Sequence, residues 1–133
     1  MKQNTTLTIA SLLSILLATF HLADDIVRGM SGGGLSNLVA VVICAVWLYG
    51  TVVLAERPAG YIIILVASLL MMVVLILHMK GPGVGFGTVR SNGLFFVWTL
   101  LALGVTALFS VILSGRALRK GAWRDSSRDA KEV

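Results

Sequence analysis

Residues 6 to 28 read TLTIASLLSILLATFHLADDIVR, and this stretch decides the class of fold. The stretch contains no ionisable residue up to Phe20. Its full length exceeds the roughly 20 residues that a helix needs to cross a bilayer core. Lipid offers the backbone no hydrogen-bond partners, so a spanning segment folds as an α-helix. The stretch therefore predicts a membrane helix whose charged groups are confined to its end, between His21 and Arg28.

The composition of the whole chain also indicates a membrane protein. Of its 133 residues, 57% are hydrophobic and 13% are charged, and the mean hydropathy is +0.94, whereas soluble domains carry about 25% charged residues. Apolar segments long enough to span lie near residues 6–27, 35–55, 61–78 and 94–115. We expect a single all-α integral membrane domain, residues 1–133, with four transmembrane helices and a basic cytoplasmic tail at 116–133.

The connections between these segments predict how the helices run. Residues 29–34 and 56–60 form short links rich in glycine or containing proline, and short links place successive helices antiparallel. The third link, residues 79–93, is longer and rich in glycine. The predicted architecture is an antiparallel up-down-up-down four-helix bundle.

The basic residues predict the orientation, because cytoplasmic loops are enriched in Lys and Arg. With both termini in the cytoplasm, the cytoplasmic set is Lys2, Arg57, Arg116, Arg119, Lys120, Arg124, Arg128 and Lys131, and the outer set is Arg28, Lys80 and Arg90. We therefore expect a multi-pass cell-membrane protein with both termini cytoplasmic. The net charge of +5 gathers after the last apolar segment, which is typical of a tail beside anionic lipid and not of a nucleic-acid surface.

Two rows of small residues predict where helices pack closely. Ala10, Ser14 and Ala18 lie on one side of the first segment, and Ala102, Thr106, Ser110 and Ser114 recur at intervals of four in the last. Small residues allow close contact between helices in lipid. A signal peptide cleaved after Ala23 is disfavoured, because the bulky His21 would stand three residues before the cut.

The polar end of the first segment is the candidate site. At about 100° per residue, His21, Asp24, Asp25 and Arg28 fall within one arc of roughly 100°. Antiparallel packing brings the ends of the first and third segments to the same membrane face, which adds His78 and Lys80. Charged groups at membrane depth usually face a bundle interior or a wet cavity. We expect these six residues to form a ligand-binding cluster on the extracytoplasmic side.

Three interpretations of this cluster remain open. In a structural one, His21 pairs with Asp25 and Asp24 with Arg28 at four-residue spacing. In the second, His21, Asp25 and His78 bind a metal ion as two imidazoles and a carboxylate, a haem between His21 and His78 being one variant. In the third, Arg28 and Lys80 hold a polar or anionic ligand and His21 relays protons. Two carboxylates at the end of a helix are disfavoured by its dipole, so a nearby cation would stabilise them.

The sequence thus predicts a small, non-enzymatic membrane protein whose polar cluster binds a partner subunit, an ion or a small polar ligand. Self-association or membership of a larger membrane complex is expected, because a bundle this short has little room for a transport path. The alternatives are a metal-dependent membrane enzyme, or a transporter or channel. A path from the cluster to the other face would have to use uncharged residues: Ser14, Ser68, Thr106 and Ser110.

Overall fold

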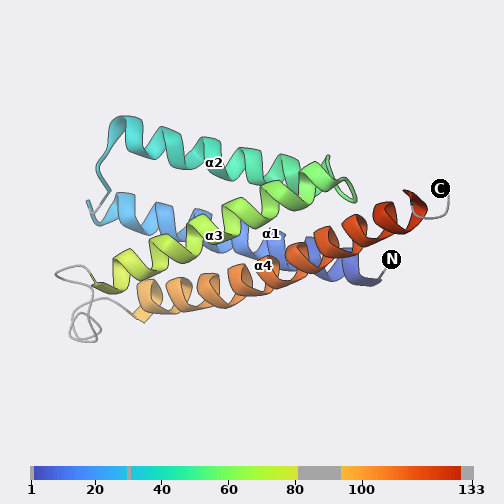
Figure 1. Cartoon of the computed structure of the whole chain (residues 1–133). Helices are drawn as coiled ribbons and strands as arrows, with labels where there is room; N and C mark the ends of the chain where they lie inside the picture. The colour runs from blue at the N-terminus through green and yellow to red at the C-terminus, as the bar shows by residue number, and fades with distance from the viewer. Residues whose placement is uncertain (1, 30, 81–93, 130–133) are drawn as a thin grey trace.

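The computed structural model describes residues 2–29, 31–80 and 94–129, with side chains from residue 5 to 78, except residue 30, and from 94 to 121, except residue 96. These residues form four helices: α1 (Lys2–Val27), α2 (Gly34–Val52), α3 (Pro58–Lys80) and α4 (Leu94–Asp129). They run alternately up and down (Figure 1). This confirms the predicted antiparallel all-α bundle.

All four helices are long and apolar enough to cross a membrane. The candidate spans are Thr5–Val27, Gly34–Val52, Pro58–His78 and Val97–Gly121. Many large hydrophobic side chains stay exposed on the outside of the bundle, such as Val27 and Leu35 at 85% and 76%. An apolar exterior is what lipid solvates, so the molecule is a multi-pass membrane protein with four spans.

The helix bounds differ from the expected ones at several ends: α1 begins at Lys2 instead of residue 6, and α3 extends over Pro58–Lys80 instead of 61–78. Helix α2 ends at Val52, three residues before the expected residue 55, and the chain then turns sharply before Pro58, whose fixed φ suits the first turn of α3. Helix α4 continues to Asp129 instead of ending near 115. The residues after Gly115 include good helix formers and no proline, so nothing in the sequence stops the helix there.

Helix α4 packs along both α1 and α3, whereas α2 is the least buried helix. Every residue of α2 is described, and Trp47, Gly50 and Thr51, all in its last third, are the ones that are buried. Figure 1 shows α2 close to α3 where the two are connected and farther away at the opposite end. The first two-thirds of α2 therefore lie against the bundle only loosely.

Close packing at the connection between α2 and α3 depends on two glycines. A Cβ atom on Gly60 would overlap the carbonyl oxygens of Leu54 and Gly50, and one on Gly50 would overlap the side chain of Ile63. Beside them, the Ser11 and Thr51 hydroxyls lie 2.7 Å apart and join α1 to α2. Thr51 donates its own proton to the Trp47 carbonyl at 2.8 Å, so Ser11 is the donor between the two hydroxyls.

The two predicted rows of small residues face the interior. Ser14 and Ala18 of α1 and Ser110 and Ser114 of α4 are buried, and Ala18 packs in one apolar cluster with Leu103 of α4. The serines donate to carbonyl oxygens one turn earlier in their own helices, at 2.6 to 3.0 Å. Their hydroxyls are thereby satisfied without a partner from another helix, and α1 and α4 can approach each other closely.

Candidate metal-binding site

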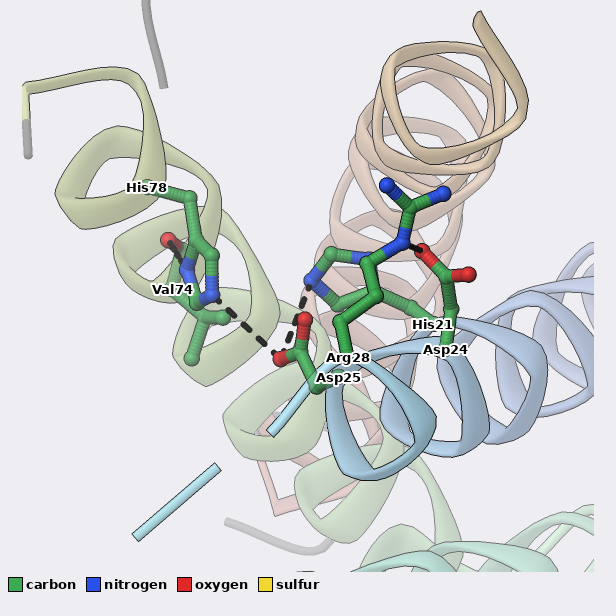
Figure 2. Close-up of polar contacts among 6 residues, drawn as sticks. All are labelled: His21, Asp24, Asp25, Arg28, Val74 and His78. Atoms are coloured by element: carbon green, nitrogen blue, oxygen red, sulfur yellow. Dashed lines mark hydrogen bonds and ion pairs between the residues drawn. The ribbon is translucent and has the colours of Figure 1, made fainter. Parts of the chain in front are cut away.

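The ends of α1 and α3 bring two histidines to one carboxylate (Figure 2). The Nε2 atom of His78 lies 3.5 Å from Oδ2 of Asp25, and Nε2 of His21 lies 3.8 Å from the same oxygen. The two imidazole rings meet edge to face, with centroids 5.0 Å apart. We call His21, Asp25 and His78 the His–Asp–His triad. It arises because Asp25 and His78 both occupy the last turn of their antiparallel helices.

The triad is shielded from outside the protein. His21 is only 5% exposed, and the side chains of Asp25 and His78 are 14% and 26% exposed. A carboxylate in such a place is stable only when it is paired or hydrogen-bonded. Both imidazoles face Asp25 Oδ2, while Oδ1 is buried without a hydrogen-bond partner among the described residues.

Asp24 and Arg28 form a separate ion pair beside the triad. The Nε atom of Arg28 lies 2.7 Å from Oδ2 of Asp24, and the pair is partly exposed. In Figure 2 the Arg28 guanidinium turns to Asp24 while the Asp25 carboxylate turns to His78. The charge of Asp24 is thus balanced by Arg28 within α1, whereas the ion pairs of Asp25 are with His21 and His78.

The orientation of His78 leaves a specific nitrogen facing Asp25. Its Nδ1 lies 2.9 Å from the carbonyl oxygen of Val74, one turn earlier in α3. A carbonyl only accepts, so Nδ1 carries a proton, and in neutral imidazole the lone pair then lies on Nε2. Two lone pairs that face each other require a proton or a bound cation between them.

The ligand geometry fits a metal ion. One ligand atom from each member of the triad can be chosen so that all three lie within 4.8 Å of one another. Metal bonds of about 2.0 to 2.1 Å place tetrahedral ligand atoms roughly 3.3 Å apart, and the two distances to Asp25 are already close to this value. A hydrogen bond from Nδ1 to a backbone carbonyl is the usual way in which a ligating histidine is oriented.

The six predicted site residues therefore divide into three groups. His21, Asp25 and His78 come together, as the antiparallel topology predicts, and Asp24 and Arg28 form the expected neighbouring pair. The side chain of Lys80 lies outside the described residues, so the pairing of Arg28 with Lys80 at an anionic ligand stays a prediction. The direct contact between the two imidazoles leaves no space for a haem plane between them.

An apolar layer separates the triad from the hydroxyls deeper in the bundle. Ser14, Ser68 and Ser110 are buried as a transport path would require, but Leu17, Ala18 and Leu103 pack together between Ser14 and the level of His21. These three residues are apolar, so they contribute no group to a polar path between the two levels. Compared with models of protein families, with curated proteins and with solved structures, the chain gives no match.

One element of the site is a backbone group that the sequence-based argument missed. The Val74 carbonyl sets the orientation of His78, yet valine carries no polar side chain to draw attention to it. The helical spacing does contain the signal, because a histidine in a helix can donate to the carbonyl four residues earlier.

Proposed function

We propose that this small four-span protein binds a divalent transition-metal ion through His21, Asp25 and His78, near the extracytoplasmic face of the membrane. The observation that carries the proposal is the meeting of three ligand atoms from two helices within 4.8 Å. The hydrogen bond from His78 Nδ1 to Val74 supports it, because it leaves Nε2 available as a ligand.

The donor set indicates the class of ion. Two imidazole nitrogens and one carboxylate oxygen favour ions such as Zn²⁺, Fe²⁺ or Co²⁺, while Mg²⁺ and Ca²⁺ prefer sets made of oxygen. Three protein ligands leave at least one coordination position for water or another ligand. Such an open site suits metal binding or handover better than a purely structural role.

The orientation and the partners of the protein belong to the same proposal. The excess of Lys and Arg near the termini and in the connection between α2 and α3 supports cytoplasmic termini, so the triad faces the outside. The loosely packed first two-thirds of α2 supports self-association or docking to a larger membrane complex. These features support a binding protein or a subunit of a larger complex.

The test is metal binding by the purified full-length protein in detergent. The wild type is stripped with a chelator, loaded with Co²⁺ or Zn²⁺, and measured for bound metal and for the Co²⁺ absorption spectrum. We expect one ion per chain in the wild type, and at least a tenfold weaker affinity in Asp25→Asn and His78→Ala, since even supporting residues contribute about 10- to 100-fold.

Asp24→Asn is the matched control, because it removes the neighbouring carboxylate that is already paired with Arg28. It should retain the ion and the spectrum. Equal loss of metal in Asp24→Asn and Asp25→Asn, or a folded wild type that binds no ion, would reject the proposal. In that event the triad is an ion-pair contact that ties α1 to α3.

A further inference from the structure

A second candidate site lies at the opposite end of the bundle from the triad. A cavity of about 350 Å³ opens between the first turns of α1, the connection from α2 to α3 and the start of α3. In Figure 1 this is the end where α2 joins α3 and where α1 begins. The volume lies at the lower end of the range of about 300 to 1,000 Å³ that small-molecule sites occupy.

The cavity has a polar side and an apolar side. Thr5, Thr8, Thr51, Glu56 and Tyr61 contribute polar groups to its lining, and Leu7, Ile9 and Ile64 contribute apolar ones. Of the lining residues, Leu7, Thr51 and Ile64 are buried, whereas Ile9 is exposed on the outer surface of the bundle.

The position of the cavity at the membrane boundary suits a ligand with two different ends. The spans α1 and α3 begin at Thr5 and Pro58, and α2 ends at Val52. Glu56 therefore lies just beyond the spans, and Ile9 and Ile64 lie within them. An occupant would place a polar group beside Glu56 and an apolar group beside the isoleucines.

The backbone at Glu56 is held in a conformation that its residue type disfavours. The Arg57 N–H donates to the Leu54 carbonyl at 3.1 Å and closes a turn, in which Glu56 has a φ of 69°. Glycine or asparagine is usual at such a position, and a side chain like that of Glu is rare there. Unfavourable backbone conformations concentrate at functional sites, and this one lies at the exposed edge of the cavity that Glu56 lines.

We propose that this cavity binds an amphipathic ligand whose polar end carries an ammonium group, with Glu56 as its counter-ion. Among the described residues that line the cavity, Glu56 is the one with a formal charge, so the lining favours a cation. The hydroxyls of Thr5, Thr8 and Thr51 can accept hydrogen bonds from an ammonium. A membrane lipid with an amine headgroup and a free single-chain amine share this chemistry. This site is independent of the metal site. A negative result for ligand binding here leaves the metal proposal standing, and a negative result for metal binding leaves this one standing.

The test uses full-length protein reconstituted in bilayers of equal parts phosphatidylethanolamine and phosphatidylglycerol. The protein is extracted in mild detergent, and the phospholipids that remain bound are identified by mass spectrometry. We expect phosphatidylethanolamine to be enriched roughly two- to fivefold over the bulk ratio, because an exposed charge pair contributes only weakly. Glu56→Gln should return the ratio to that of the bulk. Arg57→Gln, a neighbouring charge change outside the lining, should leave the enrichment unchanged.

A second arm separates the two sources of the ligand. Dodecylammonium is titrated into protein that has been freed of lipid, and binding is followed by calorimetry. If dodecylammonium binds the wild type and not Glu56→Gln while phosphatidylethanolamine is not enriched, that pair of results assigns the site to free amphipathic amines. The proposal is wrong if neither probe distinguishes the wild type from Glu56→Gln, or if phosphatidylglycerol is the enriched lipid.

Glu56→Gly distinguishes ligand binding from a structural role of the turn. Glycine adopts a positive φ without steric conflict, so this variant should unfold at the same temperature as the wild type or a higher one, and still lose the enrichment. A variant that unfolds at a lower temperature and retains the enrichment would show that Glu56 serves the turn and not the cavity.

Discussion

Nε2 of His78 lies 3.5 Å from Oδ2 of Asp25 and thereby joins the last turn of α3 to the last turn of α1. These two helices make few other contacts, because α4 and α2 each pack against both of them. Together with the edge-to-face contact of His21 and His78, the contact between His78 and Asp25 links α1 to α3 at this membrane face. A species that binds between the two side chains would hold the ends of both helices in place.

Metal should stabilise the wild-type protein against heat. Binding to the folded state alone raises the free energy of unfolding by about 2.7 kcal/mol when the free ion is at 100 times its dissociation constant. The unfolding temperature should therefore rise with added Zn²⁺ in the wild type and stay unchanged in Asp25→Asn. Fluorescence-monitored melting in detergent measures this. A rise of equal size in Asp25→Asn would place the ion elsewhere.

Metal affinity should decrease as the pH falls below neutrality. Protons compete with the metal for the imidazole nitrogens and for the carboxylate, and binding releases them. Titrations with Co²⁺ at several pH values should show this decrease in the wild type, together with proton release into a weakly buffered solution. An affinity that does not change with pH would contradict coordination by His21 and His78.

The hydrogen bond between Ser11 and Thr51 should contribute measurably to stability. Ser11→Ala removes the donor to Thr51, and side-chain hydrogen bonds between membrane helices contribute about 0.6 kcal/mol on average. Ser14→Ala is the matched control, because Ser14 donates to the Ala10 carbonyl within its own helix. Reversible unfolding in mixed detergent should show a larger loss for Ser11→Ala. Equal losses in the free energy of unfolding of the two variants would mean that the hydrogen bond between α1 and α2 contributes nothing to stability.

Gly60→Ala should destabilise the bundle by about 2 kcal/mol or more, since its Cβ would overlap two backbone carbonyl oxygens that cannot easily move. Gly115→Ala meets nothing within 4 Å and should be neutral or stabilising by up to about 1 kcal/mol, because alanine favours the helix. Thermal unfolding of both variants checks this pair. A stable Gly60→Ala would show that α2 and α3 are not packed this closely.

The proposed orientation can be checked by cysteine labelling in a Cys44→Ser background. Ser31→Cys lies after α1 and should react with a membrane-impermeant maleimide added outside intact cells. Arg57→Cys lies between α2 and α3 and should react only after the membrane is opened. The opposite result would place the triad on the cytoplasmic side.

The architecture and the triad could be predicted from the sequence because both follow from simple geometry. The apolar segments predict the spans, short links make them antiparallel, and Asp25 and His78 each precede the end of their helix by two residues. Such helices end at the same membrane face, so Asp25 and His78 are expected at the same depth, close enough for the packing of the bundle to bring them together.

Other features depend on packing and could not be predicted in this way. The cavity beside Glu56 forms only when the start of α1 meets the connection between α2 and α3. The positive φ of Glu56 comes from a turn that does not contain the usual glycine. The loose packing of α2 cannot be predicted from the sequence either. Its sequence is about as apolar as those of α1 and α4, and an apolar helix is accommodated equally well by lipid and by protein.

The length of α4 extends the reach of the molecule beyond the bilayer. A helix of 36 residues is about 54 Å long, compared with a hydrocarbon core of about 30 Å. The same helix lies along both α1 and α3. Its carboxyl-terminal part therefore extends past the hydrocarbon core, at the end of the bundle opposite the triad (Figure 1).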